Sequence, residues 1–158
     1  MENNVYKKAR LKAAKNDPSL STAEKAFSQL FMSREKLLMI EQADPTKRQA
    51  VPDPDEVVVM AKVYGAPELR DHYCTHHCPI GKDRKPLVHD SLGDISSRLM
   101  AALYFLDEAN AKIHNILEDS QVTEEEKQDF VTSLKILKNI AYSTNCLELW
   151  AKKNNLTD

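Results

Sequence analysis

The chain has 158 residues, a formal net charge of −2 and a pI near 6.2. This length allows one domain or two small ones, and the near-neutral charge excludes a polycation, so any binding of nucleic acid must rely on local positive charge. No apolar run approaches the roughly 20 residues of a membrane span. The N-terminus lacks the pattern of a signal peptide, and three cysteines are an odd number for a secreted disulfide framework. We therefore expect a cytoplasmic protein with no membrane partner.

The composition predicts an all-α fold. The chain contains only three glycines, is rich in Leu, Ala, Lys and Glu, and has no segment with the alternation of a strand. We expect a small helical domain over residues 1–70, a linker rich in Cys and His over 71–89, and a helical hairpin over 90–158. Residues 1–48 hold ten Lys and Arg against six Asp and Glu, whereas residues 69–158 hold eleven against fourteen. The positive excess thus lies in the first domain.

A first helix is predicted over residues 4–15. Val5, Ala9 and Ala13 recur near helical spacing. The remaining positions carry the basic side chains Lys7, Lys8, Arg10, Lys12 and Lys15, which we expect to point outward. Asn16–Ser19 then breaks the helix.

Residues 21–41 are predicted to form two short helices joined by a tight turn. Ser21 and Glu24 have the spacing of a capping box, and Ser33 can cap the second helix. The expected inward side chains are Ala26, Phe27, Leu30, Leu37 and Ile40, with Leu38 as an additional candidate. The expected outward side chains of the second helix are Arg34, Glu35, Lys36 and Met39. Such a pair is typical of a helix-turn-helix motif, whose second helix enters the major groove of DNA.

A loop over residues 42–51 and two further helices complete this domain. Asp53, Pro54 and Glu56 form a strong helix start, because Asp53 can cap, Pro54 suits the first helical position and Glu56 closes a capping box. This helix is expected to end at Gly65. A fifth short helix is expected from Pro67 to about Tyr73.

Residues 5–69 resemble the lambda-repressor/Cro-like (Xre family) helix-turn-helix regulators. The resemblance rests on residues 22–33, on the pattern Leu37, Ile40, Glu41, and on residues 51–64. Phe31 stands where the family has a turn glycine. The resemblance implies a five-helix domain that binds operator DNA as a dimer, in a bacterial or mobile-element transcription regulator, with repression the expected effect. The residues expected to contact DNA are Thr22, Ser33, Arg34, Glu35, Lys36, Met39, Lys47 and Arg48.

The linker contains a candidate zinc site. On a helix, Cys74, His77 and Cys78 would share one face, and thiolate and imidazole are ligands that zinc prefers. A structural zinc site needs four ligands, so Cys146, another histidine or a second subunit would have to complete this one. The alternative interpretation is a helix end with two half-buried thiols and no metal. No other cofactor is expected.

The C-terminal half is predicted to form two long helices, over residues 90–118 and from about 123 to 153. The first carries a heptad seam of apolar residues at Leu92, Ile95, Leu99, Ala102, Leu106, Ala109, Ile113 and Ile116. The second carries two apolar stripes, one of Phe130, Leu134, Leu137 and Ala141 and one of Ile136, Ile140, Leu147 and Trp150. A hairpin with two stripes on one helix favours a homodimer, with an interface at Leu92, Ile95, Leu99, Leu106, Ile113, Leu137 and Trp150. The alternative is a monomer in which the hairpin packs on the first domain.

Two further hypotheses remain open beside DNA binding. The helix-turn-helix domain can serve as a protein-interaction module that does not read DNA, an option favoured by Phe27 and Phe31. The Cys/His segment can make the protein a metal- or redox-responsive regulator. No residue pattern points to an enzymatic reaction or to a small-molecule substrate.

Overall fold

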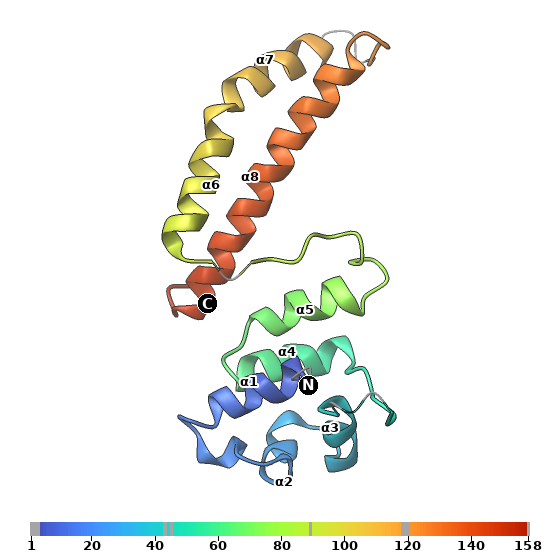
Figure 1. Ribbon diagram of the computed structural model, residues 1–158, viewed down its shortest axis with the longest axis vertical. Coiled ribbons are helices and arrows are strands. Elements are labelled where there is room, and N and C mark those ends of the chain that lie inside the picture. The colour runs from blue at the N-terminus through green and yellow to red at the C-terminus, as the bar shows by residue number, and fades with distance from the viewer. Residues whose placement is uncertain (1–3, 43, 45, 89, 118–120, 158) are drawn as a thin grey trace. The chain divides into compact units, whose positions relative to one another are not determined.

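The structure, a computed structural model, describes residues 4–42, 44, 46–88, 90–117 and 121–157. These residues form eight α-helices and two short 3-10 helices, with no strand among them, so the all-α prediction is confirmed. By internal packing the chain divides into two compact units, Met1–Pro86 and Leu87–Asp158, shown in Figure 1. None of the helices described is both long and apolar enough to cross a membrane.

The first unit contains five α-helices. They are α1 (Val5–Ala13), α2 (Ala23–Ala26), α3 (Arg34–Ile40), α4 (Pro54–Val63) and α5 (Glu68–His76), with 3-10 helices at Pro18–Leu20 and Phe27–Leu30. The predicted second helix is therefore α-helical for one turn and then tightens into a 3-10 helix. Because α5 continues to His76, Cys74 lies on a helix, whereas Cys78 follows its end.

Several helix ends are held by the side chains that the sequence indicated. Ser33 caps α3, accepting the backbone N–H of Lys36 at 3.1 Å. Glu56 accepts the backbone N–H of Asp53 at 2.8 Å in the predicted capping box of α4. Gly65 follows α4 with a φ of +58°, in the left-handed region that glycine adopts without strain.

The predicted capping box at Ser21 and Glu24 is wrong. Thr22, not Ser21, is the N-cap of α2, and its side chain makes no capping hydrogen bond. Ser21 instead closes the preceding 3-10 helix, because its backbone N–H donates to the Pro18 carbonyl at 3.2 Å. Its φ and ψ of −64° and −32° are helical, whereas an N-cap residue needs an extended backbone.

The core of the first unit collects apolar side chains from every helix of that unit. Leu37 and Ile40 of α3 and Leu69 of α5 are completely buried. They pack in one cluster with Tyr6, Leu20, Ala23, Ala26, Leu30, Val57, Met60, Ala61, Tyr64 and Ala66. This cluster fixes α3 on a continuous apolar base and leaves its opposite side to solvent.

The second unit is an antiparallel hairpin, one leg of which is interrupted. The structure contradicts the predicted single helix over 90–118, because this leg consists of α6 (Leu92–Tyr104) and α7 (Leu106–Leu117), which both pack along α8 (Lys127–Lys153). The interruption lies at Phe105, whose backbone N–H donates to the Ala102 carbonyl at 3.3 Å in a tightened turn. No Pro or Gly stands there, but the aromatic pair Tyr104–Phe105 has weaker helical preference than its neighbours.

The predicted seam is the side of this leg that faces α8. Ile95, Ala109 and Ile116 are buried, and Leu99, Ala102, Leu106 and Ile113 are half-buried. On α8, the buried positions are Ser133, Ser143, Cys146 and Leu149. The stripe of Ile136, Ile140, Leu147 and Trp150 is half-buried beside them, whereas Leu134, Leu137 and Ala141 of the other stripe are exposed.

Candidate nucleic-acid interface

The exposed side of α3 is the candidate reading surface. Arg34 and Glu35 are exposed as predicted. Met39 was predicted to point outward but is half-buried, and its carbonyl accepts the backbone N–H of Ala50 at 3.1 Å. Leu38, a candidate for the inward side, is instead 40% exposed. The outer surface of α3 is thus less polar than the sequence suggested.

Phe31 occupies the turn between the two short helices in a strained conformation. Its φ of 55° and ψ of 32° are left-handed, a region that costs a residue with a Cβ about 1 kcal/mol. Its side chain gains no burial in return, because it is 88% exposed. The strained backbone makes this exposed side chain a candidate contact residue beside α3.

The two cations of α3 are each held by carboxylates of neighbouring elements. Arg34 lies 2.9 Å from Glu24 on α2. The Lys36 ammonium lies 2.8 Å from Asp53 and 2.7 Å from Glu56, at the start of α4. Hydrogen bonds to these two carboxylates raise the pKa of Lys36. Sequence reasoning missed these three acidic partners, because they are distant along the chain and only the fold brings them to α3.

The other predicted DNA contacts lie at the edges of this surface. Thr22 is exposed, and Ser33 is exposed with its hydroxyl engaged in the cap of α3. In the loop after α3, Lys47 lies 3.8 Å from Asp44, and Arg48 is exposed. Exposed lysines also line α1 at Lys7, Lys8 and Lys12, and Lys15 follows its end, so the accessible positive charge lies as much on and after α1 as on α3.

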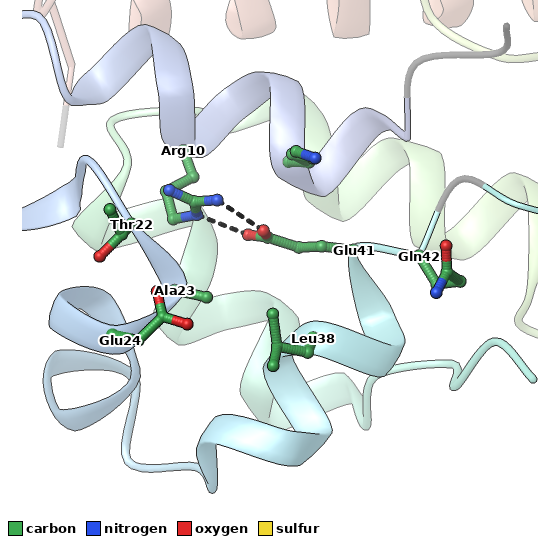
Figure 2. Close-up of a pocket in the computed structure, with 8 residues that line it drawn as sticks. Arg10, Thr22, Ala23, Glu24, Leu38, Glu41 and Gln42 are labelled. Carbon is green, nitrogen blue, oxygen red and sulfur yellow. Dashed lines mark hydrogen bonds and ion pairs between the residues drawn. The ribbon is translucent and has the colours of Figure 1, made fainter.

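A hollow of about 380 Å³ lies where α1, α2 and α3 meet. Figure 2 shows the buried ion pair of Arg10 and Glu41 on its wall. The guanidinium donates through Nε and through a terminal nitrogen to the two carboxylate oxygens, both at 2.7 Å. Its other terminal nitrogen donates to the Leu20 carbonyl at 2.8 Å. The hydrogen bond to Glu41 raises the pKa of Arg10, so the guanidinium stays charged inside the domain.

The prediction that Arg10 points outward is wrong. Its side chain is only 4% exposed, because it lies on the same face of α1 as the buried Tyr6, four residues earlier. That spacing was visible in the sequence. The identification of Glu41 as the partner required the fold, since 31 residues separate the two.

The Cys/His segment forms a cluster of aromatic rings. His72 stacks on His76 with ring centroids 4.2 Å apart, and its edge meets Tyr6 of α1 at 5.8 Å. Burial, with smaller contributions from the neighbouring His76 and His77, lowers the pKa of His72 to about 4. Burial likewise lowers the pKa of His77. His72 is therefore neutral at physiological pH.

The predicted zinc ligands are not assembled into a site. Within the described ranges, no group of three or more His, Cys, Asp or Glu side chains is placed to hold a metal ion. Cys74 and Cys78 are free thiols, both half-buried, and Cys146 is a free thiol buried in the second unit. This arrangement matches the alternative interpretation of a helix end with two half-buried thiols.

Most of the predicted dimer-interface residues are used within the hairpin. Ile95 is buried there, and Leu99, Leu106, Ile113 and Trp150 are half-buried. Of the predicted set, only Leu92 and Leu137, at 41% and 39%, are exposed. Apart from Leu92, the first residue of the seam, the hydrophobic surface that remains accessible on the hairpin therefore lies beside the seam.

Comparisons with known proteins identify no relative of this chain. No protein-family model matches it, and neither a curated protein nor a solved structure matches it.

Proposed function

We propose that the protein is a sequence-specific DNA-binding transcription regulator, acting as a repressor, that binds operator DNA as a dimer. The observation that carries the proposal is α3 itself: a capped helix behind a tight turn, held by Leu37 and Ile40 on a closed core, with Arg34 and Glu35 exposed. An exposed helix of this kind fits the major groove of DNA. The resemblance of residues 5–69 to lambda-repressor/Cro-like regulators supports the same function. No enzymatic reaction is part of the proposal.

The ion pairs around α3 determine how such binding would work. To reach a base or a phosphate, Arg34 must leave Glu24, and Lys36 must leave Asp53 and Glu56. The Arg34–Glu24 pair is exposed, with side chains 46% and 53% accessible, and exposed pairs contribute little stability. Arg34 can therefore exchange its carboxylate for guanine at low cost, whereas Lys36, with two carboxylate partners, is the harder of the two to release.

Selection of bound duplexes from a random DNA pool, using the full chain, tests the proposal. We expect one enriched sequence and an affinity for it that falls steeply as salt rises. Arg34→Ala should lower affinity for that sequence by about 5- to 150-fold and relax preference at one base position, as loss of a bidentate base contact does. Lys127→Ala, which removes an exposed ion pair of the hairpin with Glu124, is the matched control and should leave binding unchanged.

A second candidate function is a protein-interaction module. Phe31, 88% exposed, and Leu38, 40% exposed, would form its contact surface beside carboxylates that neutralise the cations of α3. Absence of DNA binding even at low salt would favour this function over the first. Phe31→Ser would then abolish capture of the partner, whereas under the DNA-binding function it would leave the base preference intact.

A further inference from the structure

The exposed ion pair between α2 and α3 borders the hollow where α1, α2 and α3 meet. The Glu24 carboxylate accepts a hydrogen bond from the Arg34 guanidinium at 2.9 Å, and the Glu24 side chain also lines the hollow. Figure 2 shows Glu24 on the α2 side of this hollow and Arg10 on the α1 side. Glu24 is therefore the residue that connects the reading surface to the hollow.

Release of Arg34 would leave the Glu24 carboxylate without this cation. Hydrogen bonds from the backbone amide of Glu24 and from the Arg34 side chain lower the pKa of the Glu24 carboxyl group, so it is ionised at neutral pH. An unpaired carboxylate beside a DNA phosphate is repelled by it, because the two charges have the same sign. The proposed DNA complex is therefore favoured by a second cation that can pair with Glu24 when Arg34 leaves it.

The hollow contains such a cation in Lys7, which lines it from α1 together with Arg10. Arg10 is already engaged, because its guanidinium donates to both carboxylate oxygens of Glu41 and to the Leu20 carbonyl. The Lys7 side chain is exposed, and its ammonium forms no ion pair with any residue in the described ranges. The flexible four-carbon stem of lysine lets this ammonium reach across the hollow toward Glu24.

We propose that Lys7 replaces Arg34 as the partner of Glu24 when Arg34 contacts a base. The inference rests on the proposed function, because it describes how α3 changes from its own ion pairs to a DNA contact. Lys7 is then a positioning residue: it does not touch DNA, and it acts by neutralising Glu24 while Arg34 reads a base. Since one ion pair forms as the other breaks, release of Arg34 costs less free energy than it would without Lys7.

Titration of the Glu24 carboxyl group by carbon NMR in the full chain tests this exchange without DNA. Arg34→Ala removes the first partner, as release of Arg34 would. In this variant we expect Lys7→Met to raise the pKa of Glu24, because it removes the second partner as well. With Arg34 present, Lys7→Met should change this pKa much less, because Arg34 occupies the carboxylate.

Lys8→Met is the matched control for the titration. It removes the same charge from the next residue of α1, which is exposed but is not among the residues that line the hollow. It should leave the pKa of Glu24 unchanged whether Arg34 is present or not. If Arg34→Ala loses the dispersed amide spectrum of the folded chain, Arg34→Gln takes its place and decides by the same criterion.

DNA binding separates this exchange from a direct contact of Lys7 with DNA. Lys7→Met should lower the affinity for the preferred sequence by about 1.5- to 5-fold, as expected for the loss of one exposed ion pair. In a Glu24→Gln chain it should have no effect, because the carboxylate that Lys7 neutralises is gone. An equal loss of affinity in both chains would show that Lys7 contacts a phosphate itself and would overturn the proposal.

The proposal is also overturned if, in Arg34→Ala, Lys7→Met raises the pKa of Glu24 no more than Lys8→Met does. This titration needs no DNA, so its result stands whether or not the chain reads DNA. Absence of a preferred duplex would refute the proposed function, and the titration alone would then decide whether Glu24 changes partner.

Discussion

At the scale of single residues, the Arg10–Glu41 pair couples α1 to the end of α3. Both side chains are 4% exposed, so removing one partner leaves an uncompensated charge inside the domain. We expect Glu41→Leu to lower the free energy of unfolding by about 3–5 kcal/mol, measured by urea denaturation. The double variant Arg10→Met/Glu41→Leu should recover most of this loss, because it removes both charges together.

An exposed pair provides the contrast for this measurement. Lys127→Met breaks the ion pair with Glu124 on the hairpin and should change the free energy of unfolding by less than about 1 kcal/mol. If Glu41→Leu lowered the free energy of unfolding no more than Lys127→Met does, the buried pair would not be holding α1 and α3 together.

His72 makes the stability of the first unit depend on pH. Its pKa is about 4 in the folded protein and about 6.5 in an unfolded chain, so between these values the unfolded state binds the extra proton. The contribution of neutral His72 to the free energy of unfolding is therefore complete above pH 6.5 and is lost as the pH falls toward 4. We expect the free energy of unfolding to decrease across this window in urea titrations. The decrease should be smaller in His72→Phe, whereas His114→Phe, at an exposed position of the hairpin, should follow the unmodified protein.

At the scale of elements, the turn after α5 depends on the absence of a side chain at Gly81. A Cβ at this position would lie 2.0 Å from the Cys74 carbonyl oxygen, so Gly81→Ala must displace the turn from the helix. The backbone N–H of Gly81 donates to Cys78 at 3.0 Å, and that of Arg84 donates to Gly81 at 2.9 Å. We expect hydrogen exchange at these two amides to accelerate at least about tenfold, which corresponds to ~1.4 kcal/mol.

Gly65 is the control for this substitution. A Cβ there would meet no atom within 4 Å, so Gly65→Ala costs only the strain of its left-handed backbone, about 1 kcal/mol. It should leave exchange at Gly81 and Arg84 unchanged. Equal exchange in both variants would show that the clash at Gly81 is relieved without loss of the turn.

At the scale of the whole molecule, the division into two compact units predicts two separable unfolding transitions. Among the described residues, the large apolar cluster of the first unit draws only on residues from Val5 to Tyr73. We therefore expect a fragment of residues 1–86 to fold alone and calorimetry of the full chain to show that Glu41→Leu shifts only one transition. In the proposed dimer, pairing of copies through the hairpin would stabilise it by mass action, so the temperature of the hairpin transition should rise with protein concentration. A single unfolding transition that Glu41→Leu shifted as a whole would show that the two units do not unfold independently.

Local patterns predicted much of the fold. The spacing of Leu37 and Ile40, the cap at Ser33 and the box at Asp53 and Glu56 each depend on residues within a few positions of one another, and each lies where expected. The heptad seam from Ile95 to Ile116 likewise identified the side that packs on α8. These features follow from helical periodicity and capping, which are properties of short segments.

What the sequence did not predict depends on contacts distant along the chain. The burial of Arg10 follows from Glu41, and the neutralisation of Lys36 follows from Asp53 and Glu56, 17 or more residues away. Charge counts located the positive excess correctly but could not show that the cations of α3 already have partners. The interruption at Phe105 was missed because the apolar seam continues across it without a change of phase.

The carboxylates that hold Arg34 and Lys36 act as internal competitors for whatever these cations bind. A ligand that supplies only scattered negative charge, such as DNA of arbitrary sequence, replaces one carboxylate contact with one phosphate contact and gains little. A ligand that offers a well-placed acceptor to each of the two cations replaces both carboxylate contacts with stronger ones. It therefore gains the difference in contact energy at both positions. In the proposed DNA complex, Glu24, Asp53 and Glu56 would therefore set a threshold for recognition. Their removal should raise the affinity for DNA of arbitrary sequence more than the affinity for the preferred sequence.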